Sequence, residues 1–320
     1  MPAPGPLPEL PAGQHTRRSL LDQGVTVAQI RRLVRNQVLV QIARGIYLHA
    51  PELVSAQPPP EPIRAAALLH GLSRDRPHAA SHATAASLLG LFGQQLRLPV
   101  HVTSPADSAG IRRATGVISH VCQLDPLDTV RSDRGILLTS PVRTWVDLSL
   151  TASLRDSVIW ADQLLRPPRP EFGDSSPQLA EPEDLWNALA RRGRVNGLRM
   201  VRTAAALARV GADSPRETEL RLALQAAGLP EADVNAWVFS DDGTPLFQPD
   251  LSYLRYKVCV QYEGRHHSAL HQVERDVSRA ELAADHGWKE VRITNRHRAR
   301  QWQPAITRVA QALRERGWHG

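Results

Sequence analysis

The sequence predicts an α+β protein built from several domains. At 320 residues, the chain is long enough to form two or three separate cores. Helical periodicity and strand alternation occur in separate blocks, and proline-rich segments such as 57–62 divide them. We therefore expect domains over 1–55, 56–170 and 213–320, with a linker and helices over 171–212.

The first fifty residues predict two helices and a hairpin. A short helix is expected over 17–23, and Thr26 should cap a second helix. The apolar face of this second helix consists of Val27, Ile30 and Val34. Residues 39–48 alternate as a hairpin, and residues 1–50 carry a net charge of +4. Helix, turn, helix and hairpin in this order predict a winged helix-turn-helix domain that binds DNA.

Amide and guanidinium groups occupy the predicted outer face of the second helix and the bend of the hairpin. Such groups reach base edges and phosphates. The predicted DNA-contacting residues are Gln29, Arg32, Arg35, Asn36 and Arg44. A winged helix that docks a protein is the alternative.

The middle segment predicts a mixed α/β domain. Its expected elements are helices over 63–72 and 79–91, strands over 100–104 and 116–121, and a helix from Val142. Arg143 and Asp147 are four residues apart, so we expect them to pair across one helical turn. His82 is expected to be a structural, hydrogen-bonding residue. The segment shows no nucleophile motif, glycine-rich phosphate loop or metal-type cluster, so we expect it to have a regulatory or coupling role.

The last third of the chain predicts the order helix, three strands, helix and strand, followed by a final helix. The expected bounds are a helix over 214–228, strands over 234–240, 246–254 and 257–263, a helix over 271–286, a strand over 289–294 and a helix over 304–316. A hairpin turn at 241–243 should join the first two strands.

Two acids lie at the ends of neighbouring predicted strands. Asp250 follows Pro249, and Glu263 ends the next strand. Alternation should place Lys257, Cys259, Gln261 and Glu263 on one face and Val258, Val260 and Tyr262 on the other. Paired carboxylates bind Mg²⁺ or Mn²⁺, and such a cation activates water for phosphodiester hydrolysis. The alternatives are a turn role for Asp250 and a solvated role for Glu263.

Charge is distributed unevenly over the C-terminal region. From Asp213 through Gly287 acids outnumber bases 13 to 7, whereas from Trp288 to the end bases outnumber acids 8 to 2. An acidic centre suits a cation, and a basic flank suits a phosphate backbone. A solvated terminal helix explains the basic flank equally well.

The residues from Ser214 to Asn295 resemble the PD-(D/E)xK restriction-endonuclease-like superfamily, in particular domains related to very-short-patch repair enzymes. The motifs that carry the resemblance are Ser214-Pro215-Arg216-Glu217, Asp250, Gln261-Tyr262-Glu263-Gly264, His266 or His267, Arg275-Asp276 and Gly287-Trp288-Lys289-Glu290-Val291-Arg292. The family places a lysine two residues after the acid, whereas this chain has Glu263 after Gln261 and Arg265 after Glu263.

The resemblance and the acid pattern together predict the parts of a nuclease site. The predicted metal ligands are Asp250, Glu263 and Glu217, and Gln261 is a further member of the catalytic set. His266 or His267 is predicted to accept a proton from the attacking water. Arg265 and Arg275 are predicted to bind phosphate. Glu217 as a first-turn acid and Arg275-Asp276 as an exposed helix face are the plainer alternatives.

The N-terminal and middle segments are similar to AbiEi-type antitoxins of type IV toxin-antitoxin systems. The motifs are Arg44-Gly45-Ile46-Tyr47, Ser81-His82, His101-Val102-Thr103 and Thr139-Ser140-Pro141-Val142-Arg143-Thr144 with Asp147-Leu148. The resemblance implies two rival functions: a catalytically inactive antitoxin that regulates transcription, or a protein that neutralises a nucleotidyltransferase toxin by contact. DNA is the expected partner in the leading hypothesis.

Composition limits the remaining classes of function. Cys122 and Cys259 are the only cysteines and lack zinc-ribbon spacing, which favours a reducing cytoplasm. No apolar run approaches the ~18 residues of a membrane span, and the opening Met-Pro-Ala-Pro-Gly-Pro lacks a signal-peptide core. We expect a soluble cytoplasmic protein and leave its oligomeric state open.

Overall fold

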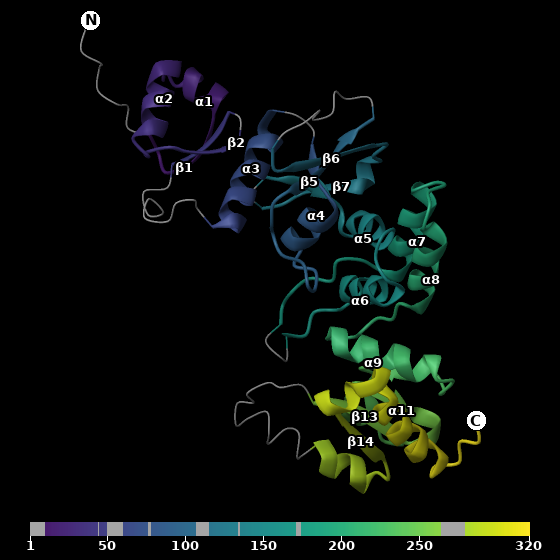
Figure 1. Cartoon of the computed structure of the whole chain (residues 1–320). Coiled ribbons are helices and arrows are strands. Elements are labelled where there is room, and N and C mark those ends of the chain that lie inside the picture. The colour runs from purple at the N-terminus through teal and green to yellow at the C-terminus, as the bar shows by residue number, and fades with distance from the viewer. Residues whose placement is uncertain are drawn as a thin grey trace, which may run out of the picture. The chain divides into compact units, whose positions relative to one another are not determined.

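The computed structural model describes residues 10–43, 45–49, 60–75, 78–106, 115–133, 135–170, 174–263 and 279–320. It is a mixed α and β protein with several small sheets, as expected for the α+β class (Figure 1). The chain divides into two compact units: unit 1 comprises 1–151 and 190–193, and unit 2 comprises 152–189 and 194–320.

Unit 1 begins with two helices and a three-stranded sheet in the order β1-β3-β2. The bounds are β1 Gly13–Thr16, α1 Arg17–Asp22, α2 Val27–Arg35, β2 Val40–Ala43 and β3 Ile46–His49. Both helices start at a threonine, Thr16 and Thr26, whose side chain accepts a hydrogen bond from the first turn. The strand β1 was not expected from the sequence.

The core of this first part is formed by Leu20, Val25, Ile30, Leu33, Leu39 and Tyr47. The expected apolar face of α2 needs one correction. Leu33 is 1% exposed, whereas Val34 is only partly buried at the edge of the cluster. The buried face of α2 is therefore turned by one residue from the expected face, which changes the side chains that point outward.

The second part of unit 1 is a five-stranded sheet in the order β6-β5-β4-β8-β7, accompanied by helices. The bounds are α3 Glu61–Asp75, β4 Ala79–Ala80, α4 His82–Leu88, β5 Val100–Pro105, β6 Val117–Cys122, β7 Thr129–Arg131, β8 Leu137–Thr139 and α5 Pro141–Ser149, with a 3-10 turn over Pro126–Asp128. The predicted helix over 79–91 is wrong at its start. Ala79 and Ala80 pair with β5 and β8, and the helix begins only at His82.

In the described part of unit 2, four helices precede the first strand, and one of them, α7, ends in two residues that belong to unit 1. The bounds are α6 Leu154–Leu164, α7 Pro182–Arg191, α8 Leu198–Leu207, α9 Pro215–Ala226, β9 Asp233–Val234, β10 Val238–Phe239, β11 Pro245–Phe247, β12 Leu251–Tyr253, β13 Val258–Glu263, β14 Lys289–Thr294 and α11 Ala299–Arg314, with 3-10 turns over Leu254–Tyr256 and Asn295–Arg298. Residues 279–285 are also helical.

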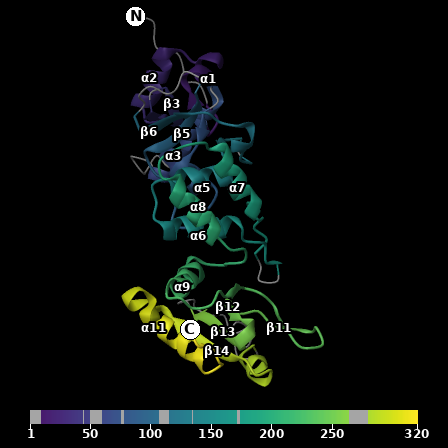
Figure 2. The same cartoon turned by 90° about the vertical axis from the view of Figure 1, so that its right-hand side faces the viewer.

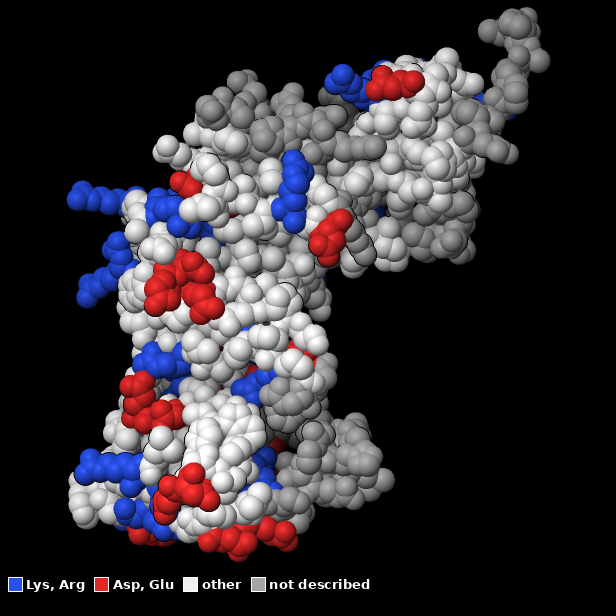
Figure 3. Space-filling view, turned by 180° about the vertical axis from the view of Figure 1, so that it is seen from behind, with Lys and Arg blue, Asp and Glu red and all other residues white. Residues whose placement is uncertain are grey.

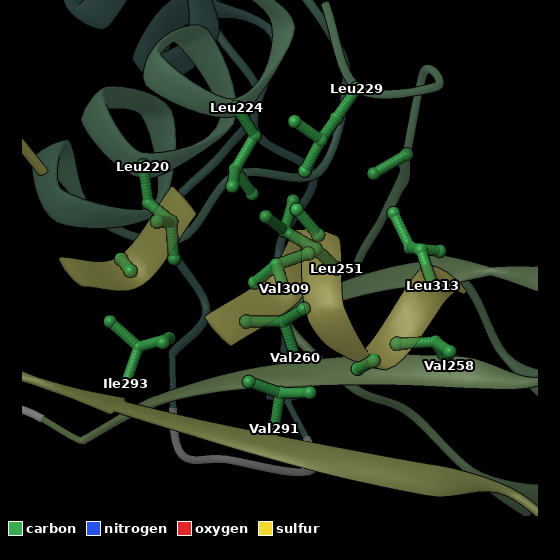
Figure 4. Packing of buried hydrophobic residues seen from close by; sticks show 14 of the residues in the cluster. Leu220, Leu224, Leu229, Leu251, Val258, Val260, Val291, Ile293, Val309 and Leu313 are labelled. Carbon is green, nitrogen blue, oxygen red and sulfur yellow. The ribbon is translucent and has the colours of Figure 1, made fainter. Parts of the chain in front are cut away.

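A four-stranded sheet in the order β14-β13-β12-β9 forms the centre of unit 2. Strands β13 and β14 are parallel, and β12 is antiparallel to β13. Helices α9 and α11 lie beside this sheet in both views (Figures 1 and 2). Leucines of α9 and aliphatic residues of α11 pack on the strands (Figure 4). This apolar layer fixes the position of α9 against the strand ends.

The faces of β13 agree with the predicted alternation. Val258 and Val260 belong to the cluster under α9 and α11, and Tyr262 packs against its edge. Cys259 belongs to a second cluster with Phe247 and Trp288. Lys257 is an exception, because it has φ 47° and ends the preceding 3-10 turn, so the strand begins only at Val258.

Two other predicted strands are interrupted. The expected strand over 234–240 is two short strands, β9 and β10, in different sheets, and the expected strand over 246–254 is β11 and β12. Asn235 causes the first break, since its φ of 43° turns the chain between β9 and β10. The predicted helix over 271–286 is described only from residue 279, and α11 begins near 299 with non-helical backbone at 300–302.

Among the described residues, no helix combines the length and the apolar character needed to cross a membrane.

Candidate active site

Asp250 lies at the end of the loop that leads into β12, opposite Gln261 of β13. The pairing of Leu251 with Val260 sets this position. One carboxylate oxygen of Asp250 accepts from Gln261 Nε2 at 2.7 Å, and the other accepts from the backbone N–H of Tyr262 at 2.6 Å. The loop therefore holds the carboxyl group firmly against the end of β13.

Glu217 lies in the first turn of α9 and is 8% exposed. Ser214 caps the helix, and its hydroxyl donates to Glu217 Oε1 at 2.7 Å. The backbone N–H of Asp213 donates to Glu217 Oε2 at 2.9 Å. The Ser-Pro-x-Glu sequence thus builds a helix start that also places a buried carboxyl group beside the sheet.

Asn235 joins the two acids. Its side-chain amide donates to Glu217 Oε2 at 2.9 Å, and its backbone N–H donates to the backbone oxygen of Asp250 at 3.0 Å. The same amide also donates to the Gly211 carbonyl at 2.8 Å. Sequence reasoning missed Asn235, and the only available signal was a polar residue that interrupts an alternating strand.

The pKa values of the two acids indicate a shared environment. Burial raises the pKa of Asp250 well above its ordinary value, and the nearby charge of Glu217 raises it further. Burial likewise raises the pKa of Glu217, while the hydrogen bond from Ser214 opposes this shift. The charge of Asp213 also raises the pKa of Glu217, so both acids lie in surroundings that disfavour a carboxylate, a setting in which a divalent cation is favourable.

Glu263 has a different environment from Asp250. Its carboxylate is exposed at the end of β13 and lies 3.5 Å from an Arg292 guanidinium nitrogen. The described acids at this end of the sheet do not form a group of three ligand atoms that all lie within 4.8 Å of one another. The structure thus pairs Asp250 with Glu217 and Gln261, and the metal role of Glu263 stays a prediction.

Several predicted nuclease residues lie outside the described part of the chain: Arg265, His266, His267, Arg275 and Asp276. Arg279 is the first described residue after this segment. Its charge lowers the pKa of Asp250, and it lies 3.5 Å from Glu290 of β14. A cationic side chain is therefore close to the acid pair.

The predicted DNA-contacting residues of α2 have different degrees of exposure. Arg35 and Asn36 are exposed, Arg32 is partly buried, and Arg44 lies outside the described residues. The side-chain oxygen of Gln29 accepts a hydrogen bond from the Thr26 backbone N–H at 2.9 Å, so the Gln29 side chain caps the helix. Arg31, which is not among the predicted DNA-contacting residues, is exposed. Its separation of four residues from Arg35 places both arginines on one outer face.

The surface charge is mixed. On the face shown in Figure 3, basic and acidic side chains are interspersed over both units. A DNA contact by this protein would therefore depend on local groups of arginines, such as those of α2, and less on a uniformly basic surface.

The ion pair predicted in the middle segment is present, and the structure shows that it is buried. Arg143 Nε lies 2.9 Å from Asp147, and the same guanidinium lies 2.6 Å from Asp128. Arg192 also approaches Asp147, at 3.4 Å. The expectation that this segment lacks a metal-type cluster is wrong. Three histidines from separate elements place one ring nitrogen each within 4.8 Å of the others; they are His82, His101 and His120.

Comparisons with known proteins give little further guidance. The chain matches no protein-family model and no curated protein. One solved structure that it resembles is the RV2827C protein from Mycobacterium tuberculosis, with 16% sequence identity over 71% of this chain and 84% of that chain and a TM-score of 0.40. A similarity at this level carries no argument about function.

Proposed function

We propose that this protein binds DNA and hydrolyses phosphodiester bonds with a metal-dependent endonuclease site in unit 2. The observation that carries the proposal is that Asn235 bridges Glu217 and Asp250 by hydrogen bonds, while the charge of Glu217 raises the pKa of Asp250. The fold class in this proposal is an αβββαβ PD-(D/E)xK domain, preceded by an N-terminal winged helix-turn-helix and an AbiEi-like middle domain.

The donor set suits Mg²⁺ or Mn²⁺. Both acids supply hard oxygen atoms, and Gln261 adds an amide next to Asp250. When bound, the cation would lower the pKa of a water molecule and stabilise charge on the phosphorus group. The Tyr262 backbone N–H orients Asp250, and the Ser214 hydroxyl orients Glu217. Both carboxyl groups are therefore held in position before a cation binds.

The other predicted residues of the site would transfer a proton and bind DNA. His266 or His267 would accept the proton of the attacking water, and Arg265 or Arg275 would hold the phosphate. The exposed arginines of α2 would hold the duplex backbone. Glu263, which lies 3.5 Å from an Arg292 guanidinium nitrogen, would be the further acidic ligand of the cation.

A second function is favoured by one observation. The Gln261 amide donates to Asp250 in a position where an acid would add negative charge for a cation. In this alternative the protein is an inactive AbiEi-type regulator whose nuclease-like domain docks nucleic acid or a nucleotidyltransferase toxin. Neutralisation of a toxin by contact through the middle domain is a separate, third hypothesis.

Nicking of supercoiled plasmid in Mg²⁺ or Mn²⁺ separates the two functions. We expect wild-type protein to nick DNA and Asp250→Asn to lower the rate on the order of 10²-fold or more, because one ligand is lost. Asp241→Asn makes the same chemical change at an exposed turn and should keep the wild-type rate. Equal inactivity of wild type and Asp250→Asn would overturn nuclease activity.

Gln261→Glu adds a further control on the same assay. If Gln261 weakens the site, the acid should increase the nicking rate through tighter cation binding. Activity in Gln261→Glu combined with an inactive wild type would support the regulator function.

A further inference from the structure

Three histidine side chains lie close together in unit 1, and they are distant in sequence from Glu217 and Asp250. His82 is the first residue of α4, His101 lies on β5 and His120 lies on β6. One nitrogen from each ring lies within 4.8 Å of the other two. His101 Nδ1 is 3.0 Å from His120 Nε2, and the His82 ring stacks on that of His120 at a centroid distance of 3.8 Å.

The sheet brings two of these rings together. Strands β5 and β6 are parallel, and Thr103 is the residue that pairs with His120. Because side chains alternate along a strand, His101 projects on the same face as Thr103 and therefore on the same face as His120. The start of α4 adds the third ring, and the His101 backbone N–H donates to Thr84 Oγ1 of α4 at 2.8 Å. The fold itself therefore brings the three rings together.

We propose that His82, His101 and His120 bind one Zn²⁺ ion through a nitrogen of each ring. Imidazole is a preferred ligand of zinc, and three histidines with an open fourth position form a known type of zinc coordination. All three rings are partly exposed, so the fourth position is open to water or a small anion. This inference goes beyond the proposed nuclease function and does not depend on it.

Zinc binding requires the rings to turn, because a bound ion lies in the plane of each imidazole ring and these rings are nearly parallel. Tetrahedral zinc with Zn–N bonds of about 2.05 Å separates its nitrogen ligands by about 3.3 Å. The His101–His120 distance of 3.0 Å is shorter by a few tenths of an ångström, and one nitrogen of each ring lies within 4.8 Å of the other two. The ion would replace the direct contact between the two rings.

Neighbouring groups prepare the rings for this role. His82 Nδ1 lies 3.0 Å from Ser81 Oγ, which leaves Nε2 for the ion. The negative charge of Asp147 favours a cation at His120, whereas the charges of Arg143 and Arg192, which pair with Asp147, oppose one at His82.

Zinc binding by the full-length protein, purified without a histidine tag, tests the proposal. After chelation, addition of Zn²⁺ and gel filtration, elemental analysis should find one zinc per wild-type chain. Replacing bound zinc by Co²⁺ should give the visible absorption bands of a low-coordinate site. His101→Ala and His120→Ala should each weaken zinc affinity by about 100-fold or more, measured by competition with a chelating indicator.

Matched variants locate the ion. His286→Ala removes an exposed histidine of unit 2 and should keep wild-type affinity. Asp250→Asn combined with Glu217→Gln should also keep it, which separates this site from the acid pair. If an alanine variant fails to fold, as judged by its circular dichroism, the corresponding glutamine variant takes its place. Zinc affinity that is unchanged in every folded variant of the three histidines, or no zinc retained by wild type, would overturn the proposal.

Discussion

At the scale of single residues, the candidate site depends on how two carboxyl groups are held. Glu217 accepts three hydrogen bonds, from Asp213, Ser214 and Asn235, and Asp250 accepts two, from Gln261 and Tyr262. Even so, burial dominates and raises the pKa of both. The sequence alone predicted that these residue types matter, but the partner of Asp250 depends on a helix start more than thirty residues earlier.

The raised pKa values predict a pH-dependent stability difference. A buried acid whose pKa is raised by folding stabilises the folded state while it is protonated. This stabilisation is lost as the pH rises from the pKa of the unfolded state, about 4, through the higher pKa of the folded state. Asp250→Asn keeps a neutral group at all pH values. In metal-free buffer, its free energy of unfolding relative to wild type should therefore increase as pH rises from about 5 to about 8.

Urea unfolding at several pH values measures this difference. Millimolar Mg²⁺ should reduce it, because the cation stabilises only wild type. Asp241→Asn, the same chemical change at an exposed turn, is the control measured beside it. A constant difference for Asp250→Asn would show that Asp250 ionises normally and would remove the argument for the acid pair.

At the scale of elements, caps and periodicity predicted helices well. Thr26 and Ser214 begin α2 and α9 as expected, because their side chains bond to the first turn. Strands were predicted less well. The break at Asn235 depends on hydrogen bonds to Gly211 and Glu217, which are distant in sequence. The two-residue β4 exists only because β5 and β8 flank it.

Helix α2 carries the prediction on DNA affinity. Arg31 and Arg35 are exposed on one face, so Arg31→Ala with Arg35→Ala should weaken binding to duplex DNA and reduce the salt dependence of the association constant by about 0.9 per lost phosphate contact. Fluorescence anisotropy at several salt concentrations measures both quantities.

The control for this prediction removes the same charge from unit 2. Arg194 and Arg199 are exposed, and Arg194→Ala with Arg199→Ala should leave affinity and salt dependence close to wild type. If the two double variants lose affinity equally, α2 has no special part in DNA binding.

At the scale of the whole molecule, the expected nuclease-like domain starts at residue 213, whereas the compact unit that contains it starts at residue 152. Asp162 of α6 explains why the earlier helices belong to this unit. Its buried carboxylate accepts from Thr218 and Arg221 of α9, each at 2.8 Å. Sequence periodicity cannot detect this contact, because it joins residues more than fifty positions apart in a single buried ion pair.

Two fragments test the importance of this contact. A fragment of residues 152–320 keeps Asp162, whereas a fragment of residues 213–320 leaves the Arg221 charge without its buried partner. The shorter fragment also loses the packing of α6 on α9, which covers Arg221 and Thr218. We therefore expect the longer fragment to unfold cooperatively in urea and the shorter one to be less stable. Equal stability would show that α6 is dispensable for this fold.

The central claim is that Glu217 and Asp250 hold a divalent cation, and Mn²⁺ titration followed by electron paramagnetic resonance tests it most directly. Wild-type protein should bind Mn²⁺, with Mg²⁺ as a competitor. The double variant Glu217→Gln and Asp250→Asn should lose that site while retaining its circular dichroism spectrum. Mn²⁺ binding that is identical in wild type and double variant, or absent from both, would contradict the claim.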